Sequence, residues 1–181
     1  MNIVKELEKE MKDNSMQLVN PNTMSVNENE GESNEVLFKR ALLCIALVGV
    51  YQYTRNTDNA LTFIQSNEHD ELLLKIFNGK LKSIEDRLYS FSHHKTANTY
   101  HMLRLIIKNI HKICRNELGS TDWTGEKVKN FFTTQRSHIL SYVPAALRMG
   151  EFTNNNIIDD RVDKMHGPFS DFFHWMGDTL F

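Results

Sequence analysis

The stretch from Asn116 to Phe132 reads NELGSTDWTGEKVKNFF, and it joins two long amphipathic segments of the chain. Before it, apolar residues recur every three or four positions between Thr96 and Gly119: Tyr100, Leu103, Ile106, Ile107, Ile110, Ile113 and Cys114. After it, the same period continues through Val128, Phe131, Phe132, Gln135, Ile139 and Val143. A repeat of this period marks one face of an α-helix. The stretch therefore predicts two helices joined by a turn that contains Trp123.

The rest of the chain also favours helices. Residues 2–13 form a short amphipathic pattern, and residues 14–33 have the polar composition of a flexible linker. A mostly apolar segment begins near Asn34 and runs to about Tyr53, and no segment alternates as a half-buried strand does. We therefore predict an all-α fold, a single-domain bundle of six to eight helices around a buried apolar helix. The domain would span residues 34–181, after a helix and linker in residues 1–33.

Charge and cysteine content indicate the location of the protein. The net charge of −2 provides no overall attraction to nucleic acid or to acidic membranes. Cys44 and Cys114 lie within apolar helical patterns, which favours buried thiols in a reducing compartment. No secretion signal follows Met1, and the longest apolar run, from Ala41 to Tyr51, is shorter than the roughly 20 residues that span a bilayer. We expect an intracellular, cytoplasmic protein with no membrane span.

The helix predicted between Thr96 and Gly119 also has a basic side. Its members, three or four positions apart, are Arg104, Lys108, His111, Lys112 and Arg115. A basic row of this kind is typical of a solvated helix face.

The motifs of several enzyme classes are missing from the sequence. It has no Gly-rich phosphate loop, nucleophile elbow, HExxH or CxxC motif. His69 and Asp70 resemble part of a metal phosphohydrolase site, but no His precedes them to supply another ligand. His93, His94 and His101 could approach one another, but no paired carboxylate accompanies them at a suitable spacing. We predict no metal site, no cofactor and no catalytic residue.

One enzyme alternative remains open. The all-helical HEPN ribonucleases use an Arg and a His separated by a few residues, in which the His transfers protons and the Arg holds phosphate. Pairs with this loose spacing are Arg87 and His93, Arg104 and His111, and Arg161 and His166. The alternative is a metal-independent ribonuclease of this type.

Nucleic-acid binding is a second alternative. The segment from Val128 to Arg136 is similar to the start of a homeodomain recognition helix, which reads Val-Lys-Asn-Trp-Phe before an Asn and an Arg. Phe131 stands in place of the Trp, and Thr134 in place of the base-reading Asn. No Arg-rich arm precedes the domain, and the net charge is negative.

The opening stretch also resembles the first homology motif of the Bcl family of apoptosis regulators. The residues that carry the resemblance are Glu117-Leu118-Gly119, Asp122-Trp123, Gly125, Val128 and Phe131-Phe132. This chain has one inserted residue before Gly125 and no Arg after it. About fifty residues later, the segment from Gly167 to Phe173 is similar to the family's second motif, Gly-Gly-Trp-x-x-Phe. In that family the most apolar helix follows the Trp, whereas here it opens the domain.

The resemblance implies a protein that binds a partner without catalysis. The partner would present an amphipathic helix, a short pro-death segment, to an apolar groove, and the outcome would be control of cell death. The predicted partner-binding residues are Trp123, Gly125, Val128, Phe131, Phe132, Phe169 and Phe172. Assembly into a homo-oligomer is a further alternative. A C-terminal membrane anchor is usual in the family, and such an anchor would place the protein at a membrane surface.

Overall fold

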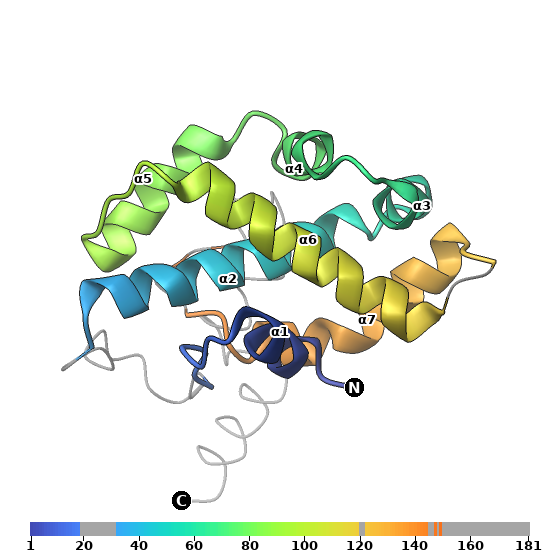
Figure 1. Ribbon diagram of the computed structural model, residues 1–181, viewed down its shortest axis with the longest axis horizontal. Helices are drawn as coiled ribbons and strands as arrows, with labels where there is room; N and C mark the ends of the chain where they lie inside the picture. Colours follow the sequence, from blue (N-terminus) through green and yellow to red (C-terminus); the bar gives the residue numbers. More distant parts are fainter. Residues whose placement is uncertain (19–31, 120–121, 145–146, 148, 150–181) are drawn as a thin grey trace, which may run out of the picture.

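The protein is a helical bundle in the part that the computed structural model describes, which is residues 1–18, 32–119, 122–144, 147 and 149 (Figure 1). The elements of this part are α1 (Ile3–Met11), α2 (Asn34–Tyr53), α3 (Thr57–Gln65), α4 (His69–Phe77), α5 (Leu81–Ser92), α6 (Thr99–Leu118) and α7 (Gly125–Leu140), with no strand among them. The predicted all-α bundle of six to eight helices is confirmed. The predictions for residues 150–181, including Phe169 and Phe172, lie outside the described residues.

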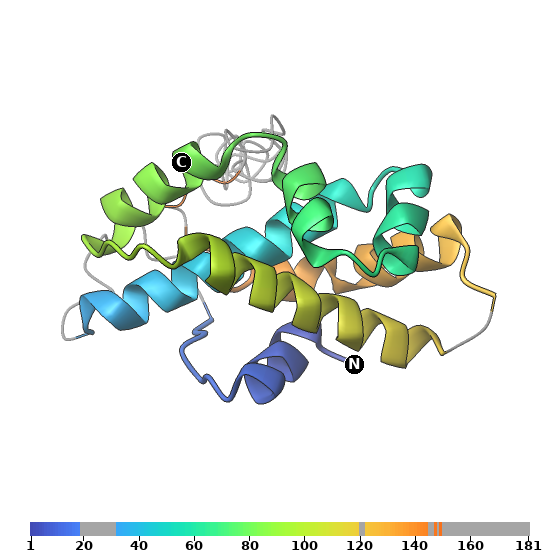
Figure 2. The same cartoon turned by 45° about the horizontal axis from the view of Figure 1, so that its top comes forward.

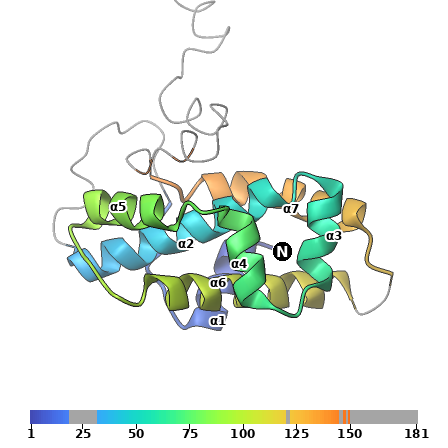
Figure 3. The same cartoon turned by 90° about the horizontal axis from the view of Figure 1, so that it is seen from above.

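α2 lies at the centre of the bundle, where it packs against α4, α5, α6 and α7 (Figure 3). Every residue from Arg40 to Tyr51 is buried, because apolar side chains surround the helix axis on all sides. Within the described ranges, α2 is the one helix with the length and hydropathy to cross a bilayer, and 78% of its most apolar window is buried inside the bundle. The prediction of a buried apolar helix is confirmed.

A glycine allows α2 to approach α4 closely. A Cβ atom added at Gly49 would lie 2.6 Å from Cε1 of Phe77, which is closer than carbon atoms pack. Phe77 is itself 1% exposed and fills the space that the missing side chain leaves. α4 ends directly after Phe77, where Asn78 and Gly79 both adopt positive φ.

α1 belongs to the same hydrophobic core as the later helices (Figure 2). Its Ile3, Val4 and Leu7 are 0–1% exposed, and it packs against α6 and α7. A helix of nine residues has too few hydrogen bonds to be stable alone, so its apolar face needs this support. The division at residue 34 follows the change in composition, but in the folded protein α1 shares the core of the domain.

Candidate functional site

The turn between α6 and α7 is built around Trp123. Gly119 and Asp122 adopt positive φ values of 76° and 60°, which turn the chain. The half-buried Trp123 donates a hydrogen bond from Nε1 to the carbonyl of Gly119 at 2.6 Å, and the Arg115 guanidinium lies 4.9 Å from the centre of its ring. Thr124 then caps α7 by accepting a hydrogen bond from the Lys127 amide. These contacts fix the direction in which α7 leaves the turn.

Gly125 has a structural role at this corner. A Cβ atom at Gly125 would lie 2.1 Å from the carbonyl oxygen of Thr57, at the start of α3. Because that obstacle is backbone, no change of rotamer could relieve the clash. The glycine lets the beginnings of α3 and α7 meet, and Thr57 Oγ1 also donates a hydrogen bond to Glu126 Oε1 at 2.9 Å.

The apolar residues that follow on α7 face the core. Val128 and Phe132 are 0% and 1% exposed, and Phe131 is 8% exposed. Phe132 packs edge-on against Phe63 of α3, with ring centres 5.5 Å apart. Side chains buried in this way stabilise the bundle by about 2–3 kcal/mol each. The predicted groove at these residues stays a prediction, since a partner could reach Val128 or Phe132 only if α7 moved away from α3.

A surface that holds an amphipathic helix does occur farther along α7, where α1 lies against α6 and the second half of α7 (Figure 1). We call it the α1-binding surface; its polar contacts to α1 and to Asn2 come from Asn109 and Lys112 of α6 and from Gln135 and His138 of α7. The buried side chain of Gln135 accepts a hydrogen bond from the backbone amide of Ile3 at 3.0 Å. This bond satisfies one of the free amides at the start of α1.

Polar groups at both ends of α1 set its position along this surface. At the start, Asn2 caps the helix, and its Nδ2 lies 3.4 Å from Nδ1 of His138. At the end, Lys112 Nζ forms an ion pair with Glu10 at 2.6 Å, and Asn109 donates to the sulfur of Met11 at 3.1 Å. The arrangement has the parts of a helix-recognition site, with apolar anchors in the middle and polar contacts at the ends.

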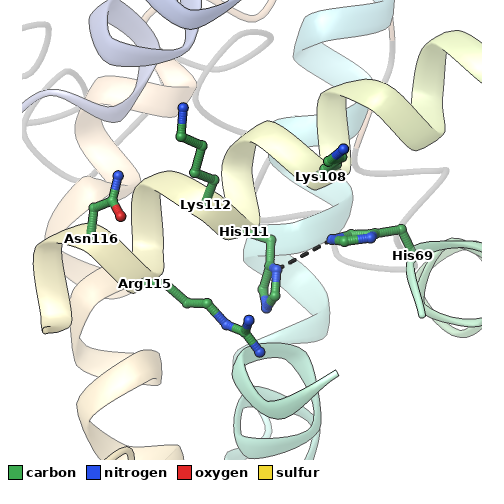
Figure 4. Close-up of a pocket in the computed structure, with 6 residues that line it drawn as sticks. All are labelled: His69, Lys108, His111, Lys112, Arg115 and Asn116. Atoms are coloured by element: carbon green, nitrogen blue, oxygen red, sulfur yellow. Dashed lines mark hydrogen bonds between the residues drawn. The ribbon is translucent and has the colours of Figure 1, made fainter. Parts of the chain in front are cut away.

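A cationic pocket lies on α6 next to the start of α4 (Figure 4). It is an open depression of about 240 Å³, lined by His69 of α4 and by Lys108, His111, Lys112, Arg115 and Asn116 of α6. Most of the basic row that the sequence places on a solvated face therefore lines this pocket. Arg115 donates to the carbonyls of Ile64 and Ser66 and to Oδ1 of Asn67, so it holds the end of α3 against α6.

The prediction that His111 lies on a solvated face of its helix is wrong, because the residue is 3% exposed. The end of α3 covers His111, and its Nε2 lies 3.2 Å from the carbonyl oxygen of Ile64. His111 Nδ1 lies 3.3 Å from Nε2 of His69. Burial, helped by the charge of Arg115, lowers the pKa of His111 to about 4, and burial with the nearby Lys108, Arg104 and Arg115 also lowers the pKa of His69. Both rings are neutral at pH 7.

The two described Arg residues of the ribonuclease alternative make contacts with groups other than their His partners. Arg87 donates to the carbonyl of Leu147, while His93 is the exposed residue that ends α5. Arg104 forms an ion pair with Asp70 at 2.8 Å, seven residues before the buried His111. The third pair, Arg161 and His166, lies outside the described residues. The ribonuclease alternative stays a prediction that no feature of the described part favours.

Other groups that could carry chemistry are also accounted for. Among the described residues, no three His, Cys, Asp or Glu side chains are placed to hold a metal ion. Cys44 and Cys114 are buried free thiols, as predicted, and burial raises the pKa of each to about 12. A thiol with so high a pKa is a poor nucleophile at neutral pH.

The chain was compared with known proteins. No protein-family model matches it, and neither the curated proteins nor the solved structures gave a match. A function for this chain therefore has to be argued from its own residues and geometry.

Proposed function

We propose that this protein is a non-enzymatic interaction domain that binds an amphipathic helix of a partner protein at the α1-binding surface. The observation that carries the proposal is α1 itself, a short amphipathic helix held there by three apolar side chains and by polar contacts at both ends. A surface that accommodates one such helix has the shape and the polar groups to accommodate another.

The contacts of α1 define the helix that fits. Its anchors are Ile3, Val4 and Leu7, and an acidic residue, Glu10, follows three positions after Leu7 to meet Lys112. The expected pattern is therefore two adjacent apolar residues, a third apolar residue three positions later, and an acid three positions after that. The anchors would supply most of the affinity, and the polar contacts would fix the register.

α1 is a natural competitor for such a partner. It is nine residues long, and its attachment to the domain runs through residues 14–33, whose composition is that of a linker. A partner helix would have to displace it, so α1 would lower the apparent affinity for the partner. If the resemblance to the Bcl family reflects shared function, the incoming helix would be a pro-death segment and the protein would regulate cell death.

The test is displacement of α1 in the protein of residues 1–181. The change Leu7→Ser weakens the docking of α1, so a fluorescent peptide of residues 1–13 should bind this variant saturably in an anisotropy titration and the unchanged protein much more weakly. The same peptide carrying Leu7→Glu is the control and should bind neither. A folded Leu7→Ser variant that does not bind the peptide would contradict the proposal.

A charge exchange tests the register without disturbing the core. In the Leu7→Ser variant, the added change Lys112→Glu should weaken binding of the peptide of residues 1–13, and Glu10→Lys in the peptide should restore that binding. Equal binding in all four combinations would mean that the peptide binds elsewhere. Helices with the derived pattern, including death-motif peptides, can then be ranked by affinity for the Leu7→Ser variant.

A further inference from the structure

The cationic pocket lies beside the α1-binding surface and shares Lys112 with it, but the helix-binding proposal makes no use of Lys108, Arg115 or His69. We infer that this pocket binds a small oxoanion, namely phosphate or the phosphate group of a small monoester, through Lys108 and Arg115 together with His69. The argument follows from the charges, from the way the side chains are held and from the size of the pocket.

Two cations of the pocket have no carboxylate partner in the described part of the chain. Lys108 is exposed, and no ion pair reaches it there. Arg115 donates only to neutral oxygens, those of Ile64, Ser66 and Asn67, so its charge is not compensated. By contrast, Lys112 is paired with Glu10 at 2.6 Å. Uncompensated charge in a concave site raises the local concentration of anions.

The pocket is also held in shape before any ligand arrives. Four hydrogen bonds and the Trp123 ring fix the Arg115 guanidinium. His69 is held by its 3.3 Å contact with the buried His111, which is itself held by the carbonyl of Ile64. A site whose donors are fixed loses little side-chain entropy when an ion binds. The guanidinium and the ammonium group are the side-chain groups that most often bind phosphate.

The imidazole of His69 links the bound anion to protonation. If His111 donates from Nε2 to the carbonyl of Ile64, its Nδ1 accepts a hydrogen bond from the N–H at Nε2 of His69, and Nδ1 of the neutral His69 ring carries no proton. The charges around His69 are Lys108, Arg104 and Arg115 on α6 and Glu68 beside it in the chain, and burial together with the three cations lowers the pKa of His69. An anion in the pocket would oppose those cations, so His69 would gain a proton at Nδ1 and become a further donor.

The volume favours a small ligand. At about 240 Å³ the pocket lies below the range of about 300–1,000 Å³ typical of sites for drug-sized molecules. It is open to solvent, so a phosphate group could enter while the rest of a monoester remained outside. This geometry allows either free phosphate or a phosphate monoester as the source of the anion.

The test follows the NMR signals of the histidine rings in the protein of residues 1–181. Inorganic phosphate should shift the His69 signal saturably at constant ionic strength and raise the pKa of His69. Phenyl phosphate and sodium chloride form separate arms: tighter binding of phenyl phosphate than of phosphate would identify a monoester as the source, and the reverse would identify the free ion. A chloride titration that matches both would overturn the inference.

A matched pair of variants completes the test. Lys108→Gln should weaken phosphate binding about tenfold, which corresponds to one lost charge-assisted hydrogen bond. Lys39→Gln removes the same charge from α2, 69 positions before Lys108, and should leave phosphate binding unchanged. Lys39 is paired with Glu35 at 2.7 Å. Equal affinities of the two variants for phosphate would mean that only the overall charge matters, and would also overturn the inference.

Discussion

α2 and α6 are both twenty residues long, but they differ in how many of their sides are buried in the bundle. In α2, every position from Arg40 to Tyr51 is buried, so the helix has no side on which a ligand could bind. In α6, the buried residues keep to one side of the helix, and the other side carries the lysines that meet α1 and line the cationic pocket. The difference teaches that a fully apolar helix can only stabilise this fold, while an amphipathic helix can also present a site.

The largest expected effect is the loss of stability on substitution by Ala. In α2 it should occur at closely spaced positions, whereas in α6 it should occur only on the buried side. Ile45 and Leu47 lie two residues apart in α2 and are both 1% exposed, so each change to Ala should lower the free energy of unfolding by about 2–5 kcal/mol. In α6, Ile106→Ala should cost a similar amount, but Lys108→Ala should change stability by less than about 0.5 kcal/mol. Urea unfolding of the four variants measures this. Tolerance of Leu47→Ala would show that α2 has an open side.

The second effect concerns the one buried imidazole of the described part of α6. The folded-state pKa of His111, about 4, lies below its usual value of 6.5, so the unfolded chain binds the proton more readily. The stability that this difference contributes is fully present above about pH 6.5 and is lost as the pH falls toward 4, about 3 kcal/mol in all.

Thermal unfolding of the protein between pH 7 and pH 4 measures this loss. In the variant His111→Gln, the side-chain amide supplies a donor for the Ile64 carbonyl but does not titrate. The stability of this variant should therefore vary much less over that pH range. His69 remains in this variant as a weaker source of the same dependence. An equally steep dependence in the variant would assign the titration to other groups.

The third effect concerns Gly49 of α2, which faces the ring of Phe77. Gly49→Ala should gain about 1 kcal/mol of helix propensity, but its Cβ would press on the buried Phe77 ring at 2.6 Å. We expect a net loss of about 1–2 kcal/mol in urea unfolding. Adding Phe77→Leu should make the double variant more stable than the sum of the two single changes predicts. Strict additivity would mean that the ring moves aside freely.

The smallest effect tests a side chain that fixes both α3 and the cationic pocket. Arg115→Lys keeps the charge but loses the planar group that reaches Ile64, Ser66 and Asn67 at once. We expect a loss of about 1 kcal/mol and faster amide hydrogen exchange at the end of α3. Exchange that stays unchanged would mean that the guanidinium is not needed to hold that end.

Local patterns predicted the helices well. The turn around Trp123 and the buried apolar helix appear where the sequence places them, because caps, turn residues and the 3.6-residue period act over short distances. The candidate site was harder to predict. The pocket depends on His69 meeting His111, and the α1-binding surface depends on Ile3 meeting Gln135, contacts between residues 42 and 132 positions apart.

The sequence alone indicates the all-α class, the helices near residues 2–13 and 34–53 and on both sides of Trp123, and the burial of α2, because each of these follows from the side chains of one segment. Only the tertiary structure decided that α1 joins the core, that His111 is covered by the end of α3, and that Gly125 is needed for α3 to meet α7. Periodicity assigns a residue to a helix face, but whether that face meets water or another helix depends on how distant segments pack.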